Sequence, residues 1–271
     1  SYDLSQISLQ SGIIKADPLY LAVLVMVFGG SFTKSAQFPF HFWLPNAMTA
    51  PTPISAFLHS ATMVKAGIYL LARLHPILGG THAWMGTLVV VGGITALLGS
   101  VLAINASDLK RILAFTTIMA LGILTMFLGG KTTPALTAAM TFLMVHSLYK
   151  SSLFLVVGII DHQTGTRQVE HIGGLLKPLP FTFFAAAAAA LSMSGFPLFF
   201  GFIGKEIMYK GALTEDMFPE FATTAALLSN SLMTAVAGII ALRPFLGPLK
   251  KTPRFPKEAP LAMWIGPVIM G

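Results

Sequence analysis

FGGSFTKSAQFPFHFWLPNAMTAPTPISAFLHSATMVKAGIYLLARL (residues 28–74) is the stretch of sequence that decides the fold. It holds parts of two apolar segments joined by a proline-rich connection, and it places Lys34, His59 and Lys65 within those segments. A lysine near the centre of a bilayer costs roughly 2.5 kcal/mol or more, so it is retained where it faces a protein interior or water. These basic groups are therefore the first evidence of function.

The rest of the chain has the composition of a membrane protein. Only 10% of its 271 residues are charged, whereas soluble domains carry about 25%. Runs of the length that spans a bilayer, about 20 apolar residues, lie at 18–38, 52–78, 84–104, 109–129, 134–160, 179–213 and 221–246, and another starts at 259. Since lipid favours helices, which bond their own backbone, we expect an all-α polytopic membrane protein, a helical bundle of about eight transmembrane segments.

The expected domain organisation is a single transmembrane domain over residues 1–271, without a soluble domain. The first 18 residues are typical of an extramembrane loop, and they lack the basic start, apolar middle and cleavage site of a signal peptide. The chain has no starting Met, and its last apolar run stops abruptly at Gly271. We therefore expect an internal fragment of a longer protein.

The basic residues are distributed unevenly between alternate loops. One set of loops carries nine of them and the other carries four, namely Lys110, Arg111, Arg167, Lys177, Arg243, Lys250, Lys251, Arg254 and Lys257 against Lys15, Arg73, Lys131 and Lys210. The positive-inside rule predicts that the first set is cytoplasmic. The net charge of +7 does not indicate nucleic-acid binding, because the densest basic run, 250–257, lies between two apolar segments and serves to orient them.

Two of the expected segments contain helix-breaking sequences. The first runs into FPFHFWLP, and the sixth contains SGFPLFFGFIGKE. Proline removes a backbone donor and clashes with the preceding turn, so we expect both helices to be kinked or interrupted. Lys34 lies close to the first break and Lys205 close to the second. Paired interruptions of this kind indicate an ion pathway near the midplane of a repeated transporter fold.

Lys34 and His59 are the first candidates for proton transfer. A desolvated amine loses part of its preference for the charged form, so it both accepts and releases protons. The alternative for Lys34 is a side chain that extends to the membrane interface. The unperturbed pKa of histidine, near 6.5, suits proton transfer, and Ser55, Ser60 and Thr62 are available to hold water or orient the ring of His59; the alternative is a structural histidine.

Lys65 follows His59 by six residues, which is about 240° around a regular helix. The two side chains would not share a face, so a direct pair is not expected. We expect Lys65 to serve a neighbouring helix or to pair with a carboxylate outside the chain.

His146 and Lys150, in FLMVHSLYKSSLFLVVG, give the strongest signal from a single helix. Their i, i+4 spacing places both side chains on one face. Ser147, Ser151 and Ser152 add to a polar stripe in an otherwise apolar span. Because extension to the interface is difficult from mid-span, we expect both bases to take part in proton transfer.

Lys205 and Glu206 follow the second helix-breaking sequence. Adjacent helical side chains point about 100° apart, so Lys205 can face the interior while Glu206 faces elsewhere; the alternative is an interfacial charge pair.

Asp108 suits the N-terminus of a helix. We assign it, with Lys110 and Arg111, to membrane topology, and proton uptake is the alternative.

Several classes of chemistry have no support in the sequence. The chain has no cysteine, which excludes disulfides, thiolate metal sites and a cysteine nucleophile. Its remaining histidines lack metal-ligand spacing, and it contains no phosphate-binding glycine loop, nucleophile elbow or HExxH motif. We expect no cofactor and no metal site, and a transporter subunit rather than an enzyme.

FTKSAQFPFHFWLPNAMTAPTPISAFLHSATMVKAG resembles the proton-translocating antiporter-like family shared by respiratory complex I, membrane-bound hydrogenases and multisubunit cation/proton antiporters of the Mrp type. VHSLYKSSLFLVVG and GFPLFFGFIGKE are similar to later motifs of that family. Within the family, Lys65 and the stretch GIIDHQTGTRQVEHIGGL (158–175) most resemble the large A subunit of Mrp antiporters.

The resemblance implies a 14-helix core with two inverted repeats of five helices, in which the seventh and twelfth helices are interrupted. The chain would then be a fragment of that core. It would hold the end of the first repeat at about 18–78, the second repeat at about 84–246, and the start of the following helix at 259–271.

The resemblance also implies residue roles. Lys34 would be the relay lysine of the first repeat, His59 the histidine of the eighth helix, and Lys205 the terminal lysine. His146 and Lys150 would be the central groups of the eleventh helix. The acidic partner of Lys34 would lie on the fifth helix of the 14-helix core, and the chain does not contain that helix.

Together these features predict a proton-translocating subunit of a multisubunit Na⁺/H⁺ antiporter. Its midplane relay would consist of Lys34, His59, Lys65, His146, Lys150 and Lys205. We expect other antiporter subunits, H⁺, Na⁺ and the lipid bilayer as partners, and a location in the inner (cell) membrane of a bacterium or archaeon. The alternatives are a proton-pumping subunit of a redox complex, either NADH-quinone oxidoreductase or membrane-bound hydrogenase, and a structural scaffold. No Na⁺ site is evident, because hard cations prefer oxygen ligands and the spans hold no carboxylate cluster.

Overall fold

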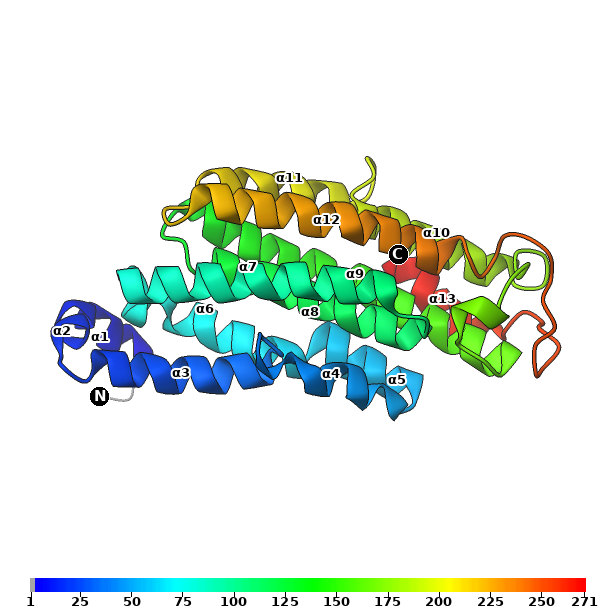
Figure 1. The fold of residues 1–271 in the computed structure, drawn as a ribbon, viewed down its shortest axis with the longest axis horizontal. Helices are drawn as coiled ribbons and strands as arrows, with labels where there is room; N and C mark the ends of the chain where they lie inside the picture. The colour runs from blue at the N-terminus through cyan, green and yellow to red at the C-terminus, as the bar shows by residue number, and fades with distance from the viewer. Residues whose placement is uncertain (1–2) are drawn as a thin grey trace.

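The computed structural model describes residues 3–271, which form an elongated bundle of helices (Figure 1). The predicted spans correspond to α3 (Tyr20–Lys34), α5 (Thr52–Ala56) with α6 (Ala66–Leu78), α7 (His82–Asn105), α8 (Leu109–Phe127), α9 (Thr133–Thr164), α10 (Pro180–Ser194), α11 (Phe200–Leu213), α12 (Pro219–Ala241) and α13 (Leu261–Met270). Five of these spans are long and apolar enough to cross a membrane, and three shorter helices are similarly apolar. The prediction of an all-α, multi-pass membrane bundle is confirmed.

α8 is the most enclosed helix of the bundle, with almost every residue buried. α7 packs closely against it at glycines on both helices. An ideal Cβ on Gly122 would lie 2.5 Å from the backbone nitrogen of Ala96, and one on Gly99 would lie 2.6 Å from that of Met119. Small residues at such crossings let helix backbones approach closely in lipid. This packing fixes which side of α8 faces α9.

The second span is not one continuous helix, as the apolar run 52–78 predicted, but is interrupted near its start. After α5, Phe57–Ala61 form the π-helix η3, and Met63–Lys65 form the 3-10 turn η4 before α6 begins. Thr62 joins the two with φ −126° and ψ −84°, outside the helical region. π-Helical turns are frequent at functional sites, and this one contains His59.

Both predicted helix breaks are confirmed. α3 ends at Lys34, and three short turns carry the chain to α5: η1 (Phe40–Phe42), α4 (Trp43–Asn46) and η2 (Ala47–Thr49). In the sixth segment, α10 ends at Ser194 and α11 begins at Phe200, with Gly195 in the left-handed conformation between them. Helix ends leave backbone carbonyls without helical partners, so each break exposes acceptors inside the bundle.

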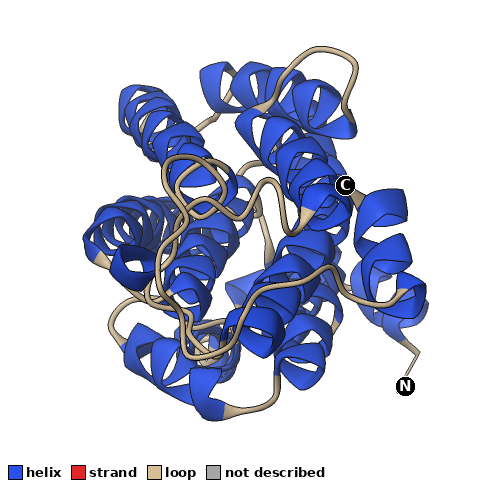
Figure 2. Ribbon diagram, turned by 90° about the vertical axis from the view of Figure 1, so that its right-hand side faces the viewer, coloured by secondary structure: helices blue, strands red, loops and turns tan. Residues whose placement is uncertain are grey.

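The two sets of basic residues counted from the sequence lie at opposite ends of the bundle. At the nine-charge end, Arg167 binds Asp108, and Arg254 donates to a carbonyl near the end of α9. At the four-charge end, the amide of Lys131 donates to Asp216. The orange and red loops of the nine-charge end lie on the right in Figure 1, and the loop between α11 and α12 lies on the left. Figure 2 looks onto the nine-charge end.

The predicted extramembrane segment at the start of the chain forms two short helices, α1 (Leu4–Leu9) and α2 (Ser11–Ala16), neither of which contains a buried residue. A further turn, η5 (Val169–His171), lies in the loop between α9 and α10. α1 and α2 pack against α6, and the extramembrane position of residues 1–18 stays a prediction.

Changing Gly122 to Ala should destabilise the packing of α7 on α8, because the added methyl group would lie 2.5 Å from a backbone nitrogen. Overpacking of this kind costs about 1–3 kcal/mol, so the thermal midpoint in detergent should fall. The matched control is Gly238→Ala in α12, where nothing lies within 4 Å of the new Cβ. It should unfold at or slightly above the wild-type midpoint, since Ala favours the helix. Equal midpoints for the two variants, measured by size exclusion after heating, would contradict the close contact.

Candidate functional site

The centre of the bundle holds basic side chains on the buried face of α9. His146 is 0% exposed and Lys150 is 1% exposed, as expected for bases that share one face at i, i+4 spacing. α8 packs against α9 here, and so do α5 and η3. The bases are therefore enclosed by protein on several sides.

The amine of Lys150 depends on a threonine of the adjacent helix. Its Nζ donates to Oγ1 of Thr116 on α8, and it lies 6.0 Å from the centroid of the Phe154 ring. The Thr116 hydroxyl donates in turn to the carbonyls of Ile112 and Leu113, at 3.2 and 3.0 Å. A hydroxyl whose proton is used in this way still offers lone pairs to an ammonium. Within residues 3–271, Thr116 is the only hydrogen-bond partner of this amine.

The ring of His146 has no hydrogen-bond partner for either nitrogen among the described residues. It packs against Tyr149 at 5.4 Å between centroids, nearly perpendicular, and against Phe142 at 6.0 Å. The Tyr149 hydroxyl is also unpartnered within the same residues. Leaving a buried polar group unsatisfied costs about 1–3 kcal/mol, so such groups indicate bound water or a functional role where they persist.

Lys65 extends from the start of α6 to α9. Its Nζ donates to Oγ of Ser147 and to the carbonyl oxygen of Leu143, the latter at 3.3 Å. The prediction that Lys65 serves a neighbouring helix is confirmed. A cavity of about 360 Å³ lies beside this contact, between α6 and α9. Lys65 therefore joins the polar stripe of α9 from a different helix.

His59 lies in the π-helix η3 and is 1% exposed. Its ring is 6.0 Å from the Phe154 ring between centroids. Among residues 3–271 none of the nearby hydroxyl groups bonds this ring, and their role in holding water stays a prediction. Ser55 and Thr62 donate to carbonyls of their own turns, and Ser60 has no partner in the described chain. Within the described residues, the contact that this imidazole makes is aromatic packing on Phe154.

Lys205 lies at the second helix break and is 8% exposed. Its Nζ donates to the carbonyl oxygen of Ser194 at 2.9 Å, an acceptor that is free because α10 ends there. Gly195 has φ 78°, and a Cβ at this position would lie 2.6 Å from Cδ of the lysine, so both the backbone and the contact favour glycine. Glu206 points away and binds Lys210 at 2.9 Å. The predicted division, with the base inward and the acid elsewhere, is confirmed.

Lys34 differs from the other candidates because its side chain is exposed at the C-terminal end of α3. Among residues 3–271 its amine takes part in none of the three ion pairs. Its role as a relay lysine stays a prediction. The fifth-helix partner that the resemblance implies is not part of this chain.

Four of the six predicted relay residues come together at the centre of the bundle: His59, Lys65, His146 and Lys150. Shared neighbours link them: Lys65 bonds Ser147, the residue next to His146. Phe154 lies 6.0 Å from the amine of Lys150 and 6.0 Å from the ring of His59. We refer to these four residues as the central cluster.

Two residues in contact with the central cluster were not predicted from the sequence, Thr116 and Tyr149. A threonine in a membrane helix normally bonds its own backbone, as Thr117 does to Leu113 at 2.8 Å, and nothing in the sequence distinguishes the two neighbours. For Tyr149 a signal exists, because it lies inside the motif HSLYK between the two bases.

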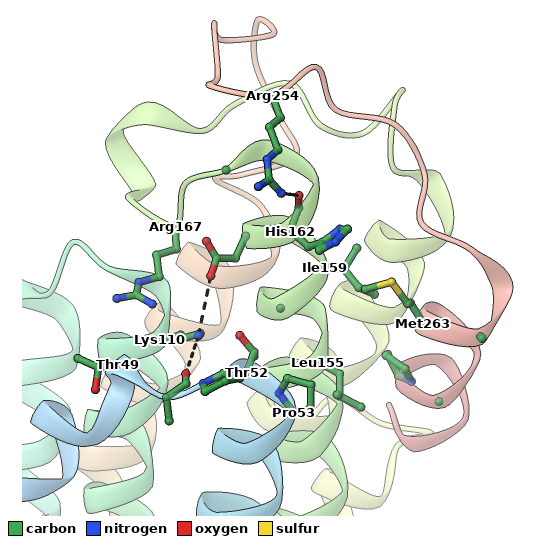
Figure 3. A pocket seen from close by; sticks show the side chains of 18 residues that line it. Thr49, Thr52, Pro53, Lys110, Leu155, Ile159, His162, Arg167, Arg254 and Met263 are labelled. Atoms are coloured by element: carbon green, nitrogen blue, oxygen red, sulfur yellow. Dashed lines mark hydrogen bonds and ion pairs between the residues drawn. The ribbon is translucent and has the colours of Figure 1, made fainter.

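A cavity of about 760 Å³ opens at the nine-charge end between α5, α9 and α13 (Figure 3). Lys110 lies in its wall, with Nζ 3.8 Å from Asp161 and 3.2 Å from the carbonyl of Ala50. Asp108 caps α8 by accepting from the amides of Lys110 and Arg111. The helix N-terminal role of Asp108 is confirmed, and the position of Lys110 in the cavity wall is compatible with the alternative of proton uptake.

The buried lysines Lys65, Lys150 and Lys205 share one electrostatic property. Among the described residues, their amines bond only neutral oxygens, and the three ion pairs involve other side chains. A buried ammonium without a carboxylate is costly. Its charged and neutral forms therefore lie closer in free energy than in water, which suits a group that exchanges protons.

Comparison with known proteins confirms the resemblance inferred from the motifs. Residues 1–234 match the family described as NADH:quinone oxidoreductase/Mrp antiporter, TM. The chain is 42% identical over 268 residues to the A/B subunit of a probable K⁺/H⁺ antiporter from Rhizobium meliloti, and 41% identical over 283 residues to the A subunit of a Na⁺/H⁺ antiporter from Alkalihalophilus pseudofirmus. These matches cover 96% of this chain but only 26% and 35% of the relatives.

A solved structure shows the same relationship. A chain of the Mrp complex from Dietzia sp. DQ12-45-1b superposes with a TM-score of 0.85 at 38% identity, covering 96% of this chain and 29% of that one. The chain thus spans about a quarter to a third of the length of the proteins that it matches. With the family matched over most of its residues, this chain belongs to the NADH:quinone oxidoreductase/Mrp antiporter transmembrane family.

Proposed function

We propose that this chain is the proton-translocating part of a multisubunit monovalent cation/proton antiporter of the Mrp type, with Na⁺ as the exchanged cation. The observation that carries the proposal is the set of three buried amines held by neutral oxygens. Similarity to proteins named as parts of Na⁺/H⁺ and K⁺/H⁺ antiporters supports the class of reaction. The chain carries out no covalent chemistry, and it belongs to a secondary transporter.

The proton relay runs through the central cluster. A proton on Lys65 opposes a second proton on Lys150, because both amines are buried and two like charges repel in a medium of low dielectric constant. Uptake of a proton at one amine therefore favours release at the next, and the coupled groups titrate as a unit. The imidazoles of His146 and His59 accept protons between these steps. Lys34 and Lys205 extend the relay along the midplane on either side.

The proposal assigns the proton relay to this chain and assigns it no cation site. Na⁺ prefers oxygen ligands, and residues 3–271 contain no group of three or more acidic or histidine side chains that would hold a metal ion. The complex lies in the inner (cell) membrane of a bacterium or archaeon, with the nine-charge end of this chain facing the cytoplasm.

A second candidate function is the pump arm of a redox complex, because the matched family also includes NADH:quinone oxidoreductase. The same lysines would then move protons, with the energy supplied by oxidation of a reductant. Neighbouring subunits that bind quinone or iron–sulfur clusters would favour this function, and small cation-antiporter subunits would argue against it.

Replacing the relay lysines should abolish exchange without preventing assembly. Everted vesicles carrying the full-length parent complex would be tested for Na⁺-dependent proton movement with Lys34→Ala, Lys150→Ala and Lys205→Ala at matched expression. Each variant should lose at least about nine-tenths of the wild-type signal, since no nearby side chain replaces the missing amine. The control Lys251→Ala removes an exposed lysine at the nine-charge end and should exchange like wild type.

Three results of this experiment would contradict the proposal in different ways. Exchange that survives all three replacements would make the lysines structural. A wild-type complex that ignores Na⁺ but pumps protons when a reductant is added would establish the redox function instead. Equal loss in the Lys251→Ala control would show that the assay reports assembly rather than proton transfer.

Thr116→Val should impair exchange and move its pH profile toward lower pH, because the charged Lys150 amine loses its hydrogen-bond acceptor. A hydrogen bond to a charged group contributes about 1.5–3 kcal/mol, so we expect the exchange rate at neutral pH to fall about tenfold or more. Thr116→Ser keeps the hydroxyl and should restore the wild-type profile.

The matched control for this variant is Thr117→Val, which removes a neighbouring buried hydroxyl that bonds only its own helix. It should leave the pH profile in place. Identical pH profiles for the two valine variants would show that Thr116 does not position the amine.

A further inference from the structure

The loop between α11 and α12 (residues 214–218) carries a buried carboxyl group that the proposed relay does not use. Glu215 is 4% exposed, and neither of its carboxyl oxygens has a hydrogen-bond partner among residues 3–271. The loop lies at the four-charge end, on the left in Figure 1. A carboxylate in such a place is costly, and the group reduces this cost by taking up a proton.

Glu215 is packed directly against the loop between α8 and α9 (residues 128–132). A Cβ on Gly130 would lie 2.8 Å from one carboxyl oxygen, 2.9 Å from the other, and 2.8 Å from Cβ of Ala135. The carboxyl group therefore lies against the backbone of this loop, where only a glycine leaves room. The contact joins the outer parts of two helix pairs that are distant in sequence.

None of the charged side chains around this contact forms an ion pair with Glu215 among residues 3–271. Asp216, its neighbour, accepts a hydrogen bond from the backbone amide of Lys131 at 2.8 Å. The Lys131 side chain lies instead along Gly80. On the α12 side, Glu220 is exposed in the first turn.

One further titratable group reaches the same loop from α6. The ring of His75 bonds the carbonyl oxygen of Gly130 at 2.9 Å, so it contacts the loop rather than the carboxyl. Burial, and after it the negative charge of Asp216, raise the pKa of Glu215 to about 8, against a smaller lowering by the backbone amide of Asp216. In this environment the carboxyl is neutral at neutral pH.

We propose that Glu215 is a proton-binding site at the four-charge end, and that the proton bound there keeps loop 214–218 docked on loop 128–132. When the proton leaves, the carboxylate needs water or a cation, and it reaches them only if the two loops separate. The loop continues directly from α11, the helix that carries Lys205, so undocking frees the end of that helix. This inference is independent of the proposed antiport activity.

The sign of the pH dependence follows from the two states of the loop. In the open state the pKa of the carboxyl is near its ordinary value of 4.5, and in the docked state it is near 8. Between these values the docked loop holds a proton that the open loop has lost. Each pH unit in this window therefore shifts the equilibrium about tenfold toward the open loop. Above about pH 8 both states are ionised and the shift ends.

Hydrogen–deuterium exchange on the full-length parent complex in lipid nanodiscs tests this proposal without a transport assay. The amide of Lys131, bonded to Asp216, reports docking of the loops. After correction for intrinsic exchange rates, wild-type protection in loops 128–132 and 214–218 should fall about tenfold per pH unit between about pH 5 and 8 and then level off. Glu215→Gln keeps a neutral side chain of the same shape, so its protection should be independent of pH.

The control Glu220→Gln removes an exposed carboxylate five residues away and should follow the wild-type curve. Wild-type protection that does not change over this pH window would overturn the proposal. So would a pH slope that persists in Glu215→Gln, because the proton would then bind elsewhere. Since no ion movement is measured, failure of the antiport function would leave these outcomes unchanged.

Discussion

An ammonium group enclosed by apolar helices must have oxygen acceptors within reach, and this requirement governs the centre of the bundle. Among the described residues no carboxylate approaches Lys65, Lys150 or Lys205. α9 supplies acceptors to the first, α8 to the second and the end of α10 to the third. The relative positions of α6, α8, α9, α10 and α11 are thus tied to three amines. Because neutral oxygens stabilise the charge less than a carboxylate does, the same contacts that position each amine also leave its proton exchangeable.

The irregular parts of the helices lie at the places where these amines need partners. A regular helix uses almost all of its own carbonyls, so an acceptor inside a bundle comes from a side chain, from a helix end, or from the second lone pair of a helical carbonyl such as that of Leu143. Ser194 supplies a helix-end carbonyl to Lys205, and Thr116 supplies a side-chain oxygen to Lys150. The π-helix around His59 rotates the residues that follow it, Lys65 among them, relative to their positions in a regular α-helix. The breaks are therefore part of the site and not only bends in the scaffold.

The two ends of the bundle treat charge in different ways. At the nine-charge end charged groups are paired, as in the contacts of Asp108 with Arg167 and of Lys110 with Asp161 around the large cavity. At the four-charge end Glu215 is buried without a cation, in a contact that has no room for a side chain on Gly130. Paired charges tolerate changes in pH over a wide range, whereas a neutral buried carboxyl does not. The titratable groups that the two proposals use thus lie at the centre of the bundle and at its four-charge end.

Sequence alone determined the features that depend on local composition and spacing. The lengths of the spans, the breaks near Pro39 and Pro197, and the shared face of His146 and Lys150 follow from apolar runs, proline chemistry and the period of the helix. The opposite orientations of Lys205 and Glu206 follow from the same period.

Only the tertiary structure decided which side chains meet across helices. The π-helix over FLHSA contains no glycine or proline to reveal it. Thr116 and Thr117 are alike in sequence, and the rotation of α8, fixed by glycine contacts with α7, selects the one that faces Lys150. Glu215 is buried for a similar reason, since two loops distant in sequence close over it. Hydropathy and helical period are properties of a single segment. The partner of a side chain depends on the crossing angle and rotation of two helices, and the packing between those helices sets both.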